Sequence, residues 1–125
     1  MTKPFPRRSA RAVLGVVGEA AAADRYRSRG FEVVACNWRC AAGEIDVIAR
    51  RADLLVFCEV KTRRGASFGG GYESVTARKQ RKLRQLGETY LRATGRRPAN
   101  IRFDVASVTV SAEGRVDVEL FEDAF

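Results

Sequence analysis

Two charged side chains end a run of apolar residues and are the first candidates for chemistry in this sequence. Residues 54–58 are Leu-Leu-Val-Phe-Cys, and Glu59 and Lys61 follow with one valine between them. If the run is a strand, residues two apart project from the same face, roughly 6.5 Å apart along the chain. Because a buried charge is costly unless it is paired or bound to a metal ion, this strand end needs an explanation.

Asp46 extends the pattern to a second predicted strand. Residues 44–51 place Ile45, Val47 and Ala49 on one face and Glu44, Asp46 and Ile48 on the other. The short turn that follows makes this strand an antiparallel neighbour of residues 54–61, so Asp46 and Glu59 can face each other. Two carboxylates about 4 Å apart repel by about 4 kcal/mol at an effective dielectric of about 20, and a divalent cation between them reverses that sign. Two interpretations stay open: a metal site beside the Lys61 ammonium, or a salt bridge among the three side chains.

Residue types that the chain lacks exclude several classes of chemistry. There is no histidine, which excludes a Ser-His-Asp triad, a Cys-His dyad and histidine metal ligands. Hard oxygen ligands remain, and these favour Mg²⁺ or Mn²⁺ over zinc. Cys36 and Cys40 have no fourth ligand for a tetrahedral site, and Cys58 is predicted to be a core residue. We expect free thiols in a cytoplasmic protein, and no nucleotide cofactor because no Gly-Lys-Ser/Thr follows the glycines near residue 70.

The charge of this 125-residue chain indicates a polyanionic partner. The net charge is +8: residues 1–112 carry 22 Lys and Arg against 10 Asp and Glu, whereas residues 113–125 carry one Arg against five acids. Such an imbalance is typical of nucleic-acid binding, although it also serves solubility. The candidate phosphate contacts are Arg63, Arg64, Arg78, Lys79, Arg81, Lys82 and Arg84. A solvated helix face is the alternative for this basic run. No stretch approaches the ~20 apolar residues of a membrane helix, so we expect no membrane partner.

The periodicity predicts one α/β domain in the order α-β-β-β-α-β-β. A helix over 10–29 is capped by Ser9 and stopped by Gly30; a second helix of about 20 residues is capped by Ser74 and stopped by Gly95 and Pro98. The apolar stripe of the second helix is Val75, Lys79, Leu83, Leu86, Tyr90 and Ala93. The predicted strands are 31–38, 44–51, 54–61, 101–110 and 115–120, with 54–61 central and the last at an edge. We expect residues 1–8 to form a flexible basic arm and residues 9–125 the single domain.

Residues 43–49 (GEIDVIA) and 57–63 (FCEVKTR) resemble the PD-(D/E)xK nuclease signature. More closely, the chain resembles the small bacterial YraN-type family, endonuclease-like proteins related to archaeal Holliday-junction resolvases. The similarity covers most of the chain and includes Gly18-Glu19, Asn37-Trp38-Arg39, Val75, Lys79 and residues 102–105. Asp…Glu-x-Lys alone is a weak signal, and the ordered set of blocks makes it specific. One departure is Ile45, which stands where the superfamily's name places a proline.

The resemblance implies a restriction-endonuclease-like fold, a mixed β-sheet flanked by helices. It implies Asp46 and Glu59 as metal ligands, Glu19 as a helix-borne acid that completes the metal shell, and the Val60 carbonyl as a further ligand. Lys61 would orient the attacking water or help to deprotonate it. The implied cofactor is Mg²⁺ or Mn²⁺, and the implied partner is DNA, with branched or junction DNA by analogy to resolvases. Those resolvases act as symmetric homodimers, but no dimer interface can be identified from the sequence.

Three classes of function follow from these observations. The first is a metal-dependent DNA endonuclease that hydrolyses phosphodiester bonds. The second is a catalytically weak or inactive nucleic-acid-binding module of the same fold. The third, an RNA- or ribosome-associated basic protein, would have no need of Asp46, Glu59 and Lys61 on one patch.

Overall fold

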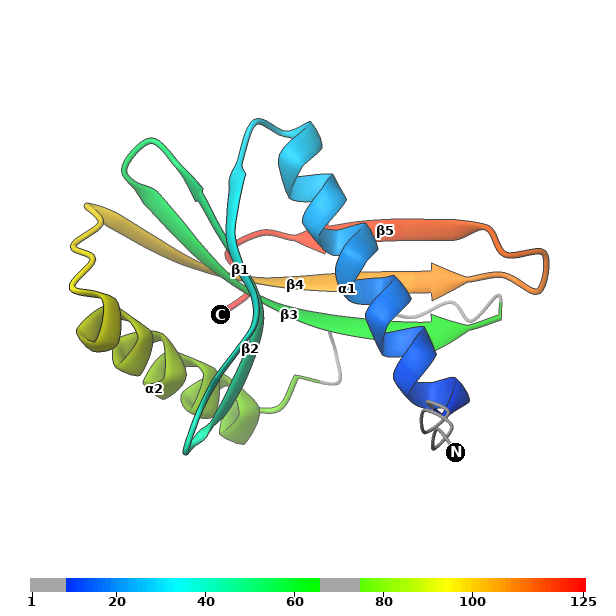
Figure 1. Cartoon of the computed structure of the whole chain (residues 1–125), viewed down its shortest axis with the longest axis horizontal. Coiled ribbons are helices and arrows are strands. Elements are labelled where there is room, and N and C mark those ends of the chain that lie inside the picture. The colour runs from blue at the N-terminus through cyan, green and yellow to red at the C-terminus, as the bar shows by residue number, and fades with distance from the viewer. Residues whose placement is uncertain (1–8, 66–74) are drawn as a thin grey trace, which may run out of the picture.

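One five-stranded sheet with helices against it forms the part of the chain that the computed structural model describes, residues 9–65 and 75–125 (Figure 1). The elements are α1 (Ala10–Ser28), β1 (Glu32–Cys40), β2 (Gly43–Arg51), β3 (Leu54–Arg64), α2 (Ala77–Thr94), β4 (Asn100–Val110) and β5 (Val116–Phe121). The strand order is β1-β2-β3-β4-β5, with β3 and β4 parallel and every other pair antiparallel. A parallel pair requires a long crossover, which α2 provides. The predicted α/β fold is confirmed, with β3 central and β5 at an edge.

Most element ends follow local signals, but α2 begins later than predicted, and β1 and β3 each end later than predicted. Ser9 caps α1 and Gly95 ends α2 in the left-handed conformation, as expected. The cap of α2 is Thr76, whose side chain accepts a hydrogen bond from the Lys79 amide, and not Ser74, which lies outside the described residues, as does the predicted arm 1–8. Val75, the residue before this cap, is buried in the core, and the helix begins just beyond it. The strand β3 continues to Arg64 because it pairs with β4 along its whole length.

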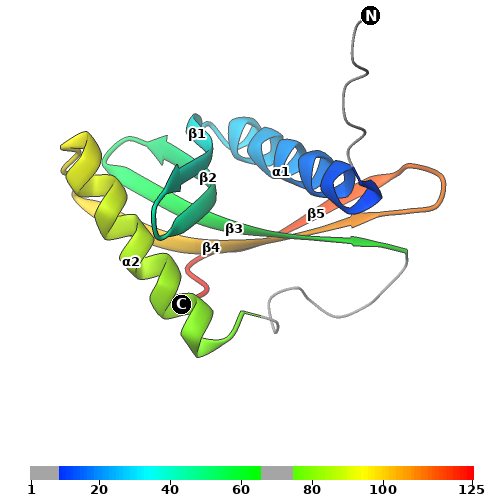
Figure 2. The ribbon, with the colours of Figure 1, turned by 60° about the horizontal axis from the view of Figure 1, so that its bottom comes forward.

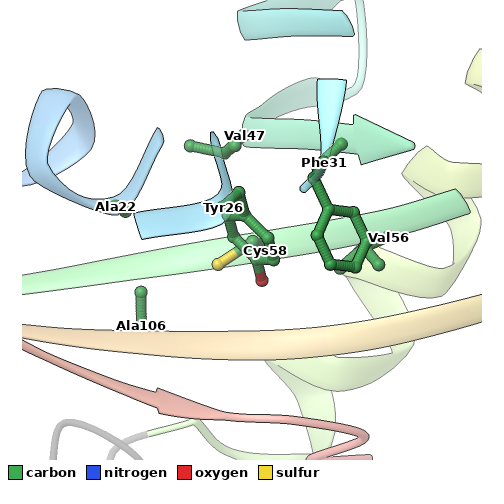
Figure 3. Close-up of a cluster of buried hydrophobic side chains, with 8 residues drawn as sticks. Ala22, Tyr26, Phe31, Val47, Val56, Cys58 and Ala106 are labelled. Atoms are coloured by element: carbon green, nitrogen blue, oxygen red, sulfur yellow. The ribbon is translucent and has the colours of Figure 1, made fainter. Parts of the chain in front are cut away.

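The two helices cover opposite faces of the sheet (Figure 2). On one face, Ala22 and Tyr26 of α1 pack against alternate residues of the central strands; this cluster also contains Phe31, Val47, Ala49, Val56, Cys58 and Ala106 (Figure 3). On the other face, Leu83, Leu86 and Tyr90 of α2 pack against Ile45, Ile48, Leu55 and Phe57. Ile45 was expected on the face of Val47, and it lies instead in the α2 cluster. On β1, Asn37 lies between the partners of Val47 and Ile45 and has a φ angle of +52°, so the regular alternation of faces is interrupted here.

The buried face of α1 is made of small residues and one tyrosine. Val13, Val16 and Val17 repeat at helical spacing, yet all three are among the exposed large hydrophobics. Gly18, Ala22, Ala23 and Tyr26 are buried instead. A Cβ atom on Gly18 would overlap the Thr62 side chain, so this glycine allows α1 to approach β3 next to Lys61. On the second helix, Ala93 of the expected apolar stripe is likewise exposed.

A closed polar network lies beneath α1. The Asp104 side chain is completely buried and accepts a 2.7 Å hydrogen bond from the Tyr26 hydroxyl. It also accepts two bonds of 2.9 Å from the Arg102 guanidinium and one of 2.9 Å from the Asp123 amide. Burial is the main cause that raises the pKa of Tyr26 far above its ordinary value, and the neighbouring Cys58 and Asp104 side chains add to it. These four hydrogen bonds, two of them from a guanidinium, compensate the buried Asp104 carboxylate. They also join α1, β4 and the C-terminal segment.

We predict that Gly18→Ala destabilises the protein by about 1–3 kcal/mol, because the new methyl group separates α1 from β3. The matched control is Gly15→Ala in the same helix, where a Cβ meets no atom within 4 Å. That change should stabilise the protein by about 0.5–1 kcal/mol through helix propensity. Urea unfolding of both variants measures the difference, and equal stability of the two would contradict the close packing at Thr62.

Candidate functional site

The candidate site lies where β2 separates from β3, a place we call the fork and define by Asp46, Glu59 and Val60. The antiparallel pairing runs from Arg51–Leu54 to Val47–Cys58 and stops one pair short of Asp46 and Glu59. The Asp46 carboxylate then substitutes for a strand partner and accepts a 2.8 Å hydrogen bond from the Val60 amide. Figures 1 and 2 show the β1–β2 hairpin bending away from β3 toward α2. The two acids therefore sit at an opening in the sheet.

Both acids of the fork are buried and repel each other. Asp46 is 8% exposed and Glu59 is 6% exposed. Burial and then the negative charge of Glu59 raise the pKa of Asp46 to about 7, although the hydrogen bond from the Val60 amide lowers it; the charges of Glu19 and Glu44 raise it by smaller amounts. The structure thus places Asp46 and Glu59 near enough for their charges to interact, although the predicted cross-strand pair is not formed because the strands separate there. Their roles as ligands remain predictions.

Two lysines approach Glu59, and neither pairs with Asp46. The Lys61 Nζ atom lies 3.7 Å and the Lys79 Nζ atom 3.4 Å from Glu59 Oε1. Lys61 is on the same face as Glu59, as expected for residues two apart, and Lys79 comes from α2. Among the residues that the structure describes, no Lys or Arg nitrogen is within 4.0 Å of an Asp46 oxygen. The salt-bridge interpretation therefore accounts for Glu59 but leaves Asp46 without a counter-charge.

Glu19 approaches the fork from α1. It is half-buried and accepts a 2.7 Å hydrogen bond from the Asn37 side-chain amide, and its charge acts on Asp46. Within 9–65 and 75–125, no three Asp, Glu or Cys side chains are gathered closely enough to form a ready-made metal site. The donor set of carboxylates and a backbone carbonyl nevertheless matches the oxygen ligands that Mg²⁺ and Mn²⁺ take. Binding would require the Glu19, Asp46 and Glu59 carboxylates to move closer together.

A basic hollow of about 550 Å³ lies on the exposed side of α2. We call it the α2 hollow, and its lining residues are Thr76, Arg78, Lys79, Arg81, Lys82 and Gln85. Lys79 belongs to both this hollow and the surroundings of Glu59, so the two are adjacent. Arg84 lies elsewhere, with its guanidinium 5.1 Å from the centre of the Phe103 ring. Arg63 and Arg64 are exposed at the end of β3, so four of the seven predicted phosphate contacts line the hollow.

Sequence reasoning did not assign a role to Asn37 or Glu44. A hollow of about 500 Å³ beside the fork is lined by Ala12, Gly15, Val16, Glu19, Asn37, Arg39 and Glu44. Asn37 and Asp46 are equally distant from the turn at residues 41–42, so counting outward from that turn places them opposite each other on the hairpin. This symmetry about the turn could have identified Asn37 from the sequence as a neighbour of Asp46.

Comparison with known proteins gives a family. Residues 18–108 match the family described as "Uncharacterised protein family UPF0102". The chain is 48% identical over 112 residues to a UPF0102 protein of Parafrankia sp. (strain EAN1pec), covering 90% of this chain and 95% of that protein. A UPF0102 protein of Symbiobacterium thermophilum is 45% identical, with the same coverage, and one of Rhodococcus jostii is 44% identical. None of the helices in the described part of the chain has the length and apolar character needed to cross a membrane.

We predict that Asp46→Asn stabilises the metal-free protein at pH 8, by up to about 4 kcal/mol, because ionising Asp46 in the folded state is unfavourable. Because the pKa of Asp46 is raised in the folded state, the Asp46 carboxyl of the unfolded chain loses its proton at a lower pH than that of the folded protein. The penalty on wild type is therefore absent below about pH 4, grows as the pH rises to about 7, and is constant above. Urea unfolding in EDTA across this range measures it.

The matched control for this prediction is Asp53→Asn in the exposed β2–β3 turn, where the carboxylate stays hydrated in both states. This surface variant should not show the stability gain at pH 8 that is expected of Asp46→Asn. A stability gain of Asp46→Asn that is the same at pH 4 and pH 8 would contradict the buried repulsion at the fork.

Proposed function

This chain belongs to the uncharacterised protein family UPF0102, and we propose that it is a metal-dependent DNA endonuclease that hydrolyses phosphodiester bonds. The observation that carries the proposal is the pair of buried carboxylates at the fork, one of which has no counter-charge. The order of elements and the Asp46…Glu59-x-Lys61 spacing support a place within the PD-(D/E)xK nucleases and the YraN-type group.

Each residue near the fork has a chemical role under this proposal. Asp46, Glu59 and Glu19 would hold Mg²⁺ or Mn²⁺, with the Val60 carbonyl as a further donor. The ion, when bound, lowers the pKa of water and neutralises charge that develops on the phosphate. Lys61 is one-third exposed, so its ammonium can reach both Glu59 and a phosphate that enters from solvent. There it would orient the attacking water or transfer a proton.

The α2 hollow supplies the DNA contact. Its cations can bind phosphates without reading sequence, which is how Lys and Arg supply most non-specific affinity. Lys79 belongs to the hollow, and its Nζ atom lies 3.4 Å from Glu59 Oε1. A DNA backbone bound in the hollow would therefore pass next to Asp46 and Glu59. Branched or junction DNA is the substrate that the resemblance to resolvases supports.

One observation favours a second candidate, a DNA-binding module of the same fold with little hydrolysis. Lys61 and Lys79 both point at one oxygen atom of Glu59, which is the arrangement of a structural ion pair. In such a module the fork would be held together by this pairing, and the α2 hollow would still bind DNA. Cleavage assays separate the two candidates.

We predict that Lys61→Ala lowers the rate of cleavage of bound DNA by about 10²-fold or more and leaves DNA affinity nearly unchanged. The assay uses labelled single-stranded, duplex, flap and four-way DNA with Mg²⁺ or Mn²⁺, at saturating protein. The control Lys82→Ala removes the same charge from the α2 hollow and should weaken affinity while bound DNA is still cut. If wild type cuts none of these forms, the enzyme proposal fails and the binding module remains.

We predict that replacing Arg78, Arg81 and Lys82 together by alanine lowers the slope of log affinity against log salt by about three, since each lost phosphate contact removes about 0.9 from the slope. Fluorescence anisotropy with a duplex of fixed length measures the slope. The control replaces Arg11, Arg25 and Arg27 of α1, which changes the net charge equally on the other face. An equal effect of both triples would place the DNA contact outside the α2 hollow.

A further inference from the structure

Asn37 has an unusual backbone for a residue inside a strand. Its φ angle is +52°, in the left-handed region that L-residues other than glycine rarely occupy, with asparagine among the tolerated exceptions. The strand pairing is regular on both sides, with Cys36 opposite Val47 and Trp38 opposite Ile45. This register places Asn37 opposite Asp46, at the fork. Such conformations are strained and persist where the surrounding structure imposes them, often beside functional groups.

The side chain of Asn37 connects the hairpin to the first helix. Its Nδ2 atom donates a hydrogen bond of 2.7 Å to Glu19 Oε2. Both residues line the hollow of about 500 Å³ beside the fork. A glutamate on a helix surface samples several rotamers, and one short hydrogen bond from a fixed donor selects among them. The bond engages one carboxylate oxygen of Glu19 and leaves the other available.

The chemical type of the donor also matters. A lysine or arginine at position 37 would neutralise Glu19, whereas a neutral amide orients the carboxylate and preserves its negative charge. That charge already acts on Asp46, and Glu19 lines the same hollow as Asn37, so it is the acid of α1 that can turn toward the fork. Hydrogen bonds of this kind behind a metal ligand fix its orientation, and their loss typically weakens metal binding by 10–100-fold.

We propose that Asn37 is a positioning residue that holds Glu19 in the orientation needed to complete a divalent-cation site with Asp46 and Glu59. This inference rests on the function proposed above. Asn37 itself touches neither the cation nor the substrate. Its left-handed backbone and its amide are two separable properties, and Asn37→Gly keeps the first while it removes the second.

The test compares Mn²⁺ affinity and folding stability of the same variants. Mn²⁺ binding is measured by electron paramagnetic resonance of the free ion, and stability by urea unfolding in EDTA. Asn37→Gly should be at least as stable as wild type, because glycine accepts a positive φ without strain, yet bind Mn²⁺ about tenfold or more weakly. Glu19→Gln should also weaken binding. Combining both changes should weaken it no further than Glu19→Gln alone, because Asn37 acts through Glu19.

A second measurement needs no substitution. In a Mg²⁺ titration of the wild-type protein followed by nuclear magnetic resonance, the Asn37 side-chain amide signal should shift with the same midpoint as the Val60 backbone amide, which reports on Asp46. If Val60 shifts and Asn37 does not, or if Asn37→Gly binds Mn²⁺ as tightly as wild type, the positioning role is overturned while the metal site stands. If neither signal shifts and wild type binds no Mn²⁺, the metal site of the proposed function fails as well.

Discussion

The separation of β2 from β3 after the Val47–Cys58 pair is the constraint on which the site depends. Continued pairing would make the sheet regular, with Asp46 and Glu59 as cross-strand neighbours of like charge, which is unfavourable. The strands part instead, and the Asp46 carboxylate satisfies the Val60 amide that lost its strand partner. The chain thereby keeps two acids buried at low hydrogen-bonding cost, but it retains their repulsion.

The helices reach this opening from opposite faces of the sheet. The small residues of α1 let it lie against β3 near Thr62, which brings Glu19 close to Asp46. The crossover required by the parallel β3–β4 pair places the start of α2 beside Glu59, where Lys79 meets it. The result is electrostatically asymmetric: Glu59 has two ammonium groups nearby, whereas Asp46 has acids and one backbone amide. A cation bound here would compensate the negative charge of Asp46.

Two buried carboxylates of this protein illustrate different uses of a charge. Asp104 is surrounded by the Tyr26 hydroxyl, the Arg102 guanidinium and the Asp123 amide, so its charge is compensated within the fold. Asp46 receives a single hydrogen bond and no positive partner among the described residues. The first arrangement is complete without a ligand and binds elements together. The second arrangement, at Asp46, would be stabilised by a bound cation. This difference separates a candidate ligand site from a purely structural carboxylate.

Local sequence determined the elements and part of the site, because strand alternation, short turns and caps act over a few residues. The shared face of Glu59 and Lys61, the antiparallel placement of Asp46, the Ser9 cap and the Gly95 stop follow from such short-range rules. Other features depend on which surfaces meet at long range: the buried face of α1, the Thr76 cap behind buried Val75, the Lys79–Glu59 pair and the Asn37–Glu19 bond. Spacing gives a helix its period but not the direction from which a sheet approaches. Gly18, whose missing side chain lets α1 dock beside β3, brings Glu19 to the acids from one face of the sheet, and the α2 crossover brings Lys79 to them from the other. Only the tertiary structure decides both approaches, because each depends on which surfaces meet.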